Sequence, residues 1–213
     1  MSAPADSAPV NGSLPDVVII DSGGANLASL RYALDRLGAR SLVSTDAALI
    51  AAAPRVLLPG VGAAAGAMAR LRSLGLDRLI PQLRAPLLGI CLGMQLLFEY
   101  SAEGETSCLG IIDGRVERLQ PSPGLPVPHM GWNTLSVQRD DPLLAGLTPA
   151  DHLYFVHSFA APTGAAAVAS VRYGEELSAI VQRDNFRGVQ FHPERSATAG
   201  ASILRNFLAL PCC

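Results

Sequence analysis

The sequence of 213 residues has few charged side chains and almost no excess of either sign. Charged residues make up 16% of the chain, and the formal net charge is −2. A surface that holds nucleic acid or an anionic membrane by charge needs clustered basic residues, so this composition argues against both partners. The most apolar stretch, residues 47–69, contains Pro54, Arg55 and Pro59, which excludes a clean membrane-spanning helix.

Cysteines are also few. The chain has four, Cys91, Cys108, Cys212 and Cys213, and their spacing fits neither a disulfide framework nor a zinc site. We therefore expect no metal and a reducing, cytoplasmic setting. The final Cys-Cys pair resembles a lipidation signal, but a disordered chain end is the favoured interpretation. Residues 1–15 lack an apolar run, which argues against a secretory signal and predicts a disordered tail.

The first half of the chain alternates strand patterns with helical ones. Apolar runs at 17–21, 41–44, 55–58 and 87–90 are separated by segments of helical period such as 26–37. This order is typical of a parallel sheet that is covered on both faces, with sites at the carboxyl ends of the strands.

The second half consists mainly of short strand-like segments between turns, followed by an amphipathic helix at 197–208. The segments are 115–119, 134–137, 153–156, 167–171, 179–182 and 188–191. We predict an α/β fold with a mixed, mostly parallel central sheet flanked by helices and an additional small antiparallel sheet in the second half. Residues 16–210 are long enough to form it as a single domain.

One cysteine lies between two glycines where a strand pattern becomes helical. The pattern Gly89-x-Cys91-x-Gly93 is the cysteine form of a nucleophile elbow, a turn so tight that its flanking positions tolerate little side chain. The Cys91 sulfur would lie at a helix N-terminus, where unpaired N–H groups favour a thiolate. Taken alone, the motif is equally compatible with a buried structural cysteine.

A second motif supplies partners for a nucleophile. Residues 188–191 predict a strand that ends at His192, and Pro193 bends the chain after it. Glu194 is then able to return toward the imidazole and set its tautomer, as the third member of a catalytic triad does. A lone histidine is weak evidence for catalysis. The tripeptide His192-Pro193-Glu194 is stronger evidence because it follows the cysteine elbow in the same chain.

The glycine-rich turn at 58–62 is a candidate source of N–H groups that would stabilise an oxyanion. One donor would be the N–H of Leu92, directly after the cysteine, and the other an N–H near Val61 or Gly62. The glycines would also let this peptide adopt two orientations, and only one of them would complete the oxyanion hole formed by the two N–H donors. An ordinary turn between a strand and a helix is the alternative.

Three motifs together, P-G-V-G at 59–62, G-I-C-L-G-M-Q at 89–95 and F-H-P-E at 191–194, resemble those of the class I (triad) glutamine amidotransferases. The resemblance covers residues 17–208. It implies that Cys91 attacks the side-chain amide of glutamine to form a γ-glutamyl thioester. His192 would protonate the departing ammonia and then activate water, with Glu194 holding the imidazole in place.

The resemblance also implies a substrate site without a cofactor. The glutamine would be held by the region of Gly62 and by Gln95, His157, Ser158 and Phe159. Gln95 lies one helical turn past Cys91, on the same face. The alternatives are a solvated helix residue at Gln95 and an ordinary core strand at 154–159.

Two further segments, P-H-M-G-W-N at 128–133 and Y-F-V-H-S-F at 154–159, are similar to the glutaminase subunits of imidazole glycerol phosphate synthases. That family implies a heterodimer whose other member is a cyclase, a (β/α)₈ barrel that receives the ammonia. The interface near the ammonia exit would include Asn26, Met130, Trp132 and Arg195. Core packing is the alternative for Trp132.

The first turn departs from the family pattern D-Y-G-x-G-N-L, since this chain has Ser22 for the tyrosine and Ala25 for the second glycine. The departure bears on the interface rather than on catalysis. Two other functions stay open at this point: a free-standing cysteine hydrolase, and a binding module that has kept the fold.

Overall fold

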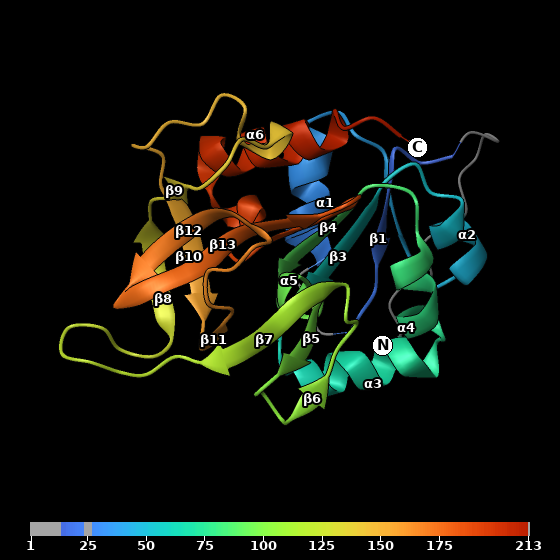
Figure 1. Cartoon of the computed structure of the whole chain (residues 1–213). Helices are drawn as coiled ribbons and strands as arrows, with labels where there is room; N and C mark the ends of the chain where they lie inside the picture. Colours follow the sequence, from blue (N-terminus) through green and yellow to red (C-terminus); the bar gives the residue numbers. More distant parts are fainter. Residues whose placement is uncertain (1–13, 24–26, 213) are drawn as a thin grey trace, which may run out of the picture.

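An eight-stranded sheet dominates the computed structural model, which describes residues 14–23 and 27–212 (Figure 1). Its order is β2 (Ser41–Ser44), β1 (Val17–Ile20), β3 (Val56–Gly60), β4 (Leu87–Cys91), β14 (Phe186–Val189), β13 (Glu175–Arg183), β12 (Ala167–Tyr173) and β9 (Ser136–Val137). The first five strands run parallel, and the last three continue the sheet in antiparallel pairs. The predicted mixed, mostly parallel central sheet is confirmed.

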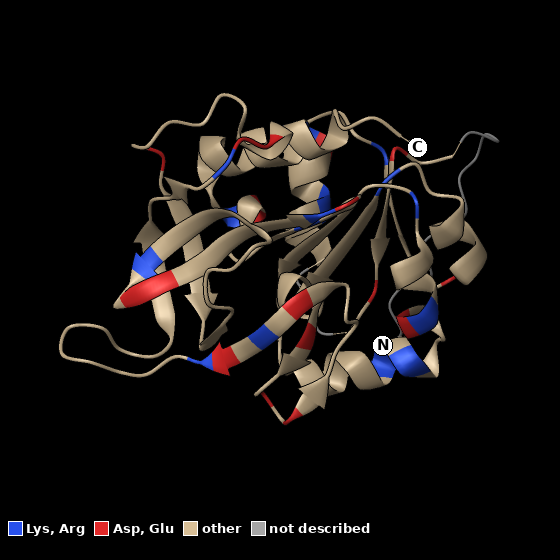
Figure 2. Cartoon of the chain, in the orientation of Figure 1, with Lys and Arg blue, Asp and Glu red and all other residues tan. Residues whose placement is uncertain are grey.

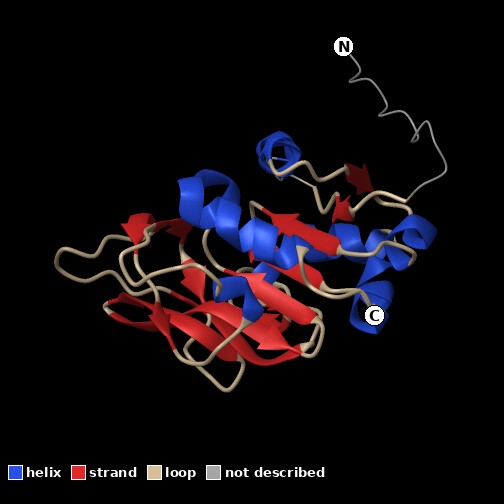
Figure 3. Ribbon diagram, turned by 90° about the horizontal axis from the view of Figure 1, so that it is seen from above, coloured by secondary structure: helices blue, strands red, loops and turns tan. Residues whose placement is uncertain are grey.

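Helices cover both faces of this sheet (Figures 1 and 3). They are α1 (Leu27–Arg36), α2 (Ala47–Ala51), α3 (Ala64–Ser73), α4 (Leu76–Leu79), α5 (Leu92–Gln95) and α6 (Ala197–Leu208), with short 3₁₀ turns η1 (Ile80–Gln82), η2 (Pro142–Leu144) and η3 (Pro193–Arg195). Val17 and Ile19 of β1 belong to a core with α1 and α6, whereas Val18 and Ile20 belong to a second core with α2, α3 and α4. Alternate residues of the strand therefore serve opposite layers. Among the described helices, none has the length and apolar character needed to cross a bilayer.

Two smaller sheets flank the central one. β8 (His129–Asn133) and β10 (Leu153–His157) form an antiparallel pair, which fits the predicted small antiparallel sheet. A second, mixed sheet has the order β11 (Phe159–Ala160), β7 (Ile112–Arg118), β5 (Phe98–Ser101) and β6 (Thr106–Ser107). Acidic and basic positions alternate along β7 (Figure 2), in keeping with the low net charge.

Sequence reasoning missed the helix α2 and the short strands β5, β6, β8 and β11. α2 is only five residues long, and it begins where the Asp46 carboxylate accepts hydrogen bonds from the N–H groups of Ala48 and Leu49. β8 lies within the 128–133 motif, where Gly131 interrupts the strand pattern. The predicted strand at 134–137 is correspondingly reduced to the two residues of β9.

Candidate active site

Cys91 joins β4 to α5 in a backbone conformation that is rare for a residue with a side chain, with φ at 53° and ψ at −110°. A β-carbon at Gly89 would come within 2.6 Å of the Gly93 carbonyl oxygen, and one at Gly93 would collide with the carbonyl oxygen of Leu58. The two glycines let α5 lie directly against β3 and β4. The backbone therefore makes the tight turn that the sequence predicts.

His192 is fixed by hydrogen bonds between η3 and β10. Its N–H donates to the Tyr154 carbonyl at 2.9 Å. The Ser196 hydroxyl donates to the His192 carbonyl at 2.7 Å and accepts from the Tyr154 N–H at 2.9 Å. Glu194 Oε1 lies 2.8 Å from His192 Nδ1. Since a carboxylate only accepts, Nδ1 carries the proton of this bond and Nε2 is left for chemistry.

Both neighbours of His192 favour its charged form. Burial lowers the pKa of His192, but the side chains of Cys91 and Glu194 together outweigh burial and raise this pKa to about 10. The second carboxylate oxygen of Glu194 is buried and has no hydrogen-bond partner within the described residues. At neutral pH the imidazole is thus an imidazolium between a carboxylate and a sulfur, an arrangement that activates a cysteine for attack on a carbonyl.

A cavity of about 380 Å³ gathers the residues that the sequence predicted for chemistry. It is lined by Cys91, His192, Glu194, Val61, Gly62, Leu92, Gln95, His157, Ser158 and Phe159. Arg195, predicted for the interface, lies at the same cavity. Side chains from distant parts of the sequence therefore converge at one place.

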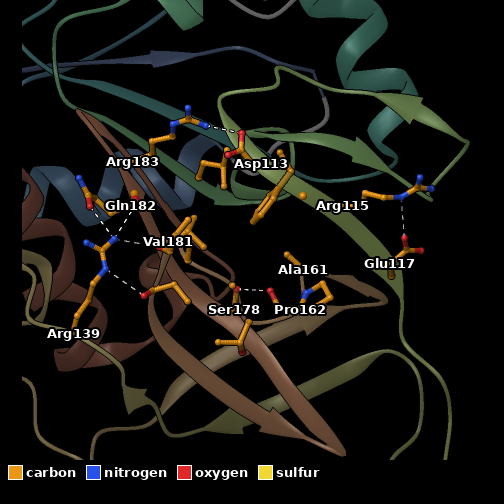
Figure 4. Close-up of a pocket in the computed structure, with 18 residues that line it drawn as sticks. Asp113, Arg115, Glu117, Arg139, Ala161, Pro162, Ser178, Val181, Gln182 and Arg183 are labelled. Atoms are coloured by element: carbon orange, nitrogen blue, oxygen red, sulfur yellow. Dashed lines mark hydrogen bonds and ion pairs between the residues drawn. The ribbon is translucent and has the colours of Figure 1, made fainter.

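A larger cavity of about 880 Å³ lies between β7 and β13 (Figure 4). Its polar side chains are bound to each other: Arg183 pairs with Asp113 at 2.8 Å, and Arg139 donates to Gln182 Oε1 at 2.9 Å. The Ser178 hydroxyl in its wall donates to a backbone carbonyl oxygen at 2.9 Å. Because these groups satisfy one another, the reactive site is the smaller cavity.

The predicted oxyanion residues lie beside the elbow. Gly60 is the register partner of Cys91 in the β3–β4 pair, which brings Val61 and Gly62 next to the sulfur-bearing turn. Gly62 has φ at +89°, a conformation that favours glycine. The buried hydroxyl of Ser22 donates to the Pro59 carbonyl at 2.7 Å. The serine that departs from the family pattern therefore tethers the strand that leads into this turn.

Gln95 is buried, so the alternative of a solvated helix residue is wrong. Its Nε2 donates to the Phe159 carbonyl oxygen at 2.8 Å and to Gln190 Oε1 at 3.0 Å. His157 Nδ1 lies 3.0 Å from the same Phe159 oxygen. The Phe159 carbonyl of β11 thus ties α5 to the end of β10.

The sequence did not point to three polar residues at or beside this site. Glu103 lines the cavity and accepts a hydrogen bond from the Ala64 N–H at the start of α3, at 2.9 Å. His129 Nδ1 lies 3.1 Å from His157 Nε2. Burial lowers the pKa of His129 to about 4 and, as the largest cause, that of His157 to about 3. The third is Gln190, for which the sequence offered only one indication, its position near the end of a predicted strand, two residues before His192.

The predicted interface residues form an exposed group beside the cavity. Met130 and Trp132 are 66% and 53% exposed, so core packing of Trp132 is wrong. The Trp132 ring packs edge-on against Tyr154, with centroids 5.8 Å apart, and the Arg195 guanidinium lies over the Tyr154 ring at 5.1 Å. Asn26, like Ala25, lies outside the described residues.

Cys108 and Cys212 are not among the residues that line the cavity. Burial is the main reason why the pKa of Cys108 is raised to about 11, which leaves it a thiol at neutral pH. Cys212 is exposed near the end of the chain, and Cys213 lies outside the described residues. In the part of the chain that the structure describes, no cluster of three His, Cys, Asp or Glu side chains is arranged to hold a metal ion.

Comparison with known proteins agrees with this geometry. Residues 18–210 match the family described as glutamine amidotransferase class-I. The chain belongs to this family. The amidotransferase is 55% identical over 197 residues to the imidazole glycerol phosphate synthase subunit HisH of Xanthomonas campestris pv. campestris (strain 8004), covering 92% of this chain and 98% of the relative. The protein of the same name from Xylella fastidiosa (strain Temecula1 / ATCC 700964) is 54% identical with the same coverage.

Solved structures share the fold of this amidotransferase at lower identity. A putative component of GMP synthase from Thermoplasma acidophilum superimposes with a TM-score of 0.71 at 19% identity, covering 93% of this chain and 94% of that one. A structure described as a glutamine amidotransferase gives a TM-score of 0.69 at 21% identity, covering 90% and 96%. These likenesses establish the fold, and the closer sequence relatives bear on function.

Proposed function

We propose that this amidotransferase is the glutaminase subunit of an imidazole glycerol phosphate synthase, that it acts in the cytoplasm, and that residues 16–210 form its single domain. The observation that carries the proposal is the convergence of Cys91, His192 and Glu194 in one cavity. The relatives named as subunits of that synthase support the choice of pathway, because they match almost the whole chain.

The reaction begins when the Cys91 thiolate attacks the side-chain amide carbon of glutamine. The carbonyl oxygen becomes an oxyanion, for which the Leu92 N–H and an N–H near Val61 or Gly62 are the proposed donors. His192 gives its proton to the departing nitrogen, ammonia leaves, and a γ-glutamyl thioester forms. His192 then takes a proton from water, which attacks the thioester, and glutamate and Cys91 are released.

The cavity offers matching groups for the other end of glutamine. The Glu103 carboxylate carries the charge that an α-ammonium group pairs with, and Ser158 and Phe159 also line the cavity. Gln95 and His157 hold this segment through the Phe159 carbonyl oxygen. The substrate is therefore proposed to lie between Glu103 and Cys91.

Released ammonia is protonated in water and loses its nucleophilicity, so a synthase of this kind must pass it through protein. The exposed Met130 and Trp132, together with Arg195 beside the cavity, are proposed to contact the (β/α)₈-barrel cyclase of the heterodimer. Exposed aromatic residues and arginine commonly anchor interfaces. The cyclase would use the ammonia to make imidazole glycerol phosphate and aminoimidazole carboxamide ribotide.

The test measures glutamate release by this chain alone, after addition of the cyclase, and after addition of both the cyclase and its nucleotide substrate. We expect stimulation by the complete mixture and loss of activity in Cys91→Ser. High activity that the cyclase leaves unchanged would instead indicate a free-standing hydrolase. Absence of hydrolysis in every mixture would indicate a binding module.

A further inference from the structure

Gln190 is a fully buried polar residue that contacts the candidate nucleophile. It follows β14 directly, and its N–H donates to the Ala179 carbonyl at 2.9 Å. The carboxamide lies between two groups: its Nε2 is 3.7 Å from Cys91 Sγ, and its Oε1 is 3.0 Å from Gln95 Nε2. Both distances are within hydrogen-bonding range, the first because sulfur is a large acceptor.

The orientation of this carboxamide is determined by a chain of contacts that starts at the backbone. The Phe159 carbonyl oxygen only accepts, so the Gln95 atom 2.8 Å from it is the nitrogen. The same nitrogen needs an acceptor for its second proton, and the Gln190 atom facing it is therefore the oxygen. The Gln190 nitrogen is then left facing the sulfur.

Besides His192, the sulfur has two polar contacts of opposite preference among the described residues. The Val156 carbonyl oxygen, 3.9 Å away, accepts from a thiol and repels a thiolate. The Gln190 N–H is a donor, which binds a thiolate more strongly than a thiol. The titratable and charged side chains at this cavity, besides Cys91, are His192 before η3, Glu194 and Arg195 of η3, His157 of β10, and Glu103.

We propose that Gln190 is a further catalytic residue, whose side-chain N–H donates a hydrogen bond to the Cys91 sulfur and stabilises the thiolate that attacks glutamine. The proposal rests on Cys91 being the nucleophile of the proposed glutaminase. His192 balances the charge of the thiolate, while Gln190 binds it by a neutral donor whose direction Gln95 maintains.

The test follows alkylation of Cys91 by iodoacetamide against pH in the full-length protein, read by mass spectrometry of the Cys91 peptide. Gln190→Met keeps the length of the side chain and removes the donor. We expect the pH at which the alkylation rate is half-maximal to rise by about one unit. At pH values below both midpoints the rate should fall roughly tenfold, as expected for the loss of a hydrogen bond to a charged group. Gln138→Met, at a glutamine near β9, is the matched control and leaves the midpoint unchanged.

A purely structural role for Gln190 would lower the melting temperature of Gln190→Met without moving the midpoint, and this result would overturn the proposal. If Gln190→Met does not fold, the same alkylation measurement on Gln95→Met is the test. This substitution removes the group that orients the Gln190 carboxamide, which is then free to turn its oxygen toward the sulfur. A raised midpoint supports the proposal, and an unchanged midpoint contradicts it. Alkylation requires no glutamine, so failure of the proposed function would appear separately, as normal alkylation of a parent protein that hydrolyses no glutamine.

Discussion

The two hydrogen-bonded histidines of β8 and β10 make the fold sensitive to mild acid. Burial lowers the pKa of His129 to about 4 and, in the main, that of His157 to about 3, against 6.5 in the unfolded chain. Their contribution to stability is therefore complete above pH 6.5 and is lost as the pH falls toward the folded values. Because one pKa unit corresponds to about 1.4 kcal/mol, each histidine lowers the free energy of unfolding at pH 5 by about 2 kcal/mol.

His192 acts in the opposite direction. Its pKa is raised to about 10, so its contribution is complete below pH 6.5 and is lost as the pH rises through about 10. Between pH 7 and pH 5 it adds less than about 1 kcal/mol. The net expectation is that the free energy of unfolding falls by about 3 kcal/mol between pH 7 and pH 5.

Urea-induced unfolding at the two pH values measures this change. The double variant His129→Gln/His157→Gln keeps polar side chains that do not titrate, so we expect its stability to vary little between pH 7 and pH 5. The exposed His152→Gln is the control and should keep the full loss. The measurement stops at pH 5 because Asp16 and Asp151, whose pKa values are lowered by hydrogen bonds, contribute at lower pH. Equal losses in the parent and the double variant would refute the reasoning.

Three substitutions test other parts of the structure. Gly93→Ala places a β-carbon against the Leu58 carbonyl, and we expect chemical denaturation to show a loss of at least roughly 2 kcal/mol, whereas Gly66→Ala in open space on α3 should lose nothing. Ser22→Ala leaves the Pro59 carbonyl without its buried donor and should cost about 1–3 kcal/mol in the same assay, an unchanged stability being contrary evidence. Trp132→Ala should weaken cyclase binding by about 2 kcal/mol or more in calorimetric titration, while Val137→Ala, also exposed, should not; equal affinities would place the interface elsewhere.

Local signals were sufficient for the central fold. The strand at 41–44 and the helix at 197–208 have the predicted bounds, since each follows a clear apolar pattern. Convergence of Cys91 and His192 also follows from the sequence pattern, although β14 ends at Val189 and not at 191 as predicted. Cys91 ends β4, His192 lies three residues beyond β14, and these two strands are parallel neighbours whose carboxyl ends meet at the same edge.

The polar partners at the site could not be predicted in the same way. Whether Gln190 or His129 is buried depends on which strands pack beside it, and the sequence around each residue contains no local sign of those neighbours. Glu103 reaches the cavity from the turn after β5, outside the recognised motifs. The short α2 depends on a single Asp46 cap rather than on a periodic apolar face.

Covalent labelling by an electrophilic glutamine analogue tests the central claim most directly, that Cys91, His192 and Glu194 act together on glutamine. We expect the label on Cys91 alone, protection by added glutamine, and labelling slowed by at least about a hundredfold in His192→Asn. Labelling of Cys108 or Cys212 instead of Cys91 would contradict the account. So would a rate of Cys91 labelling that changes neither on addition of glutamine nor in His192→Asn.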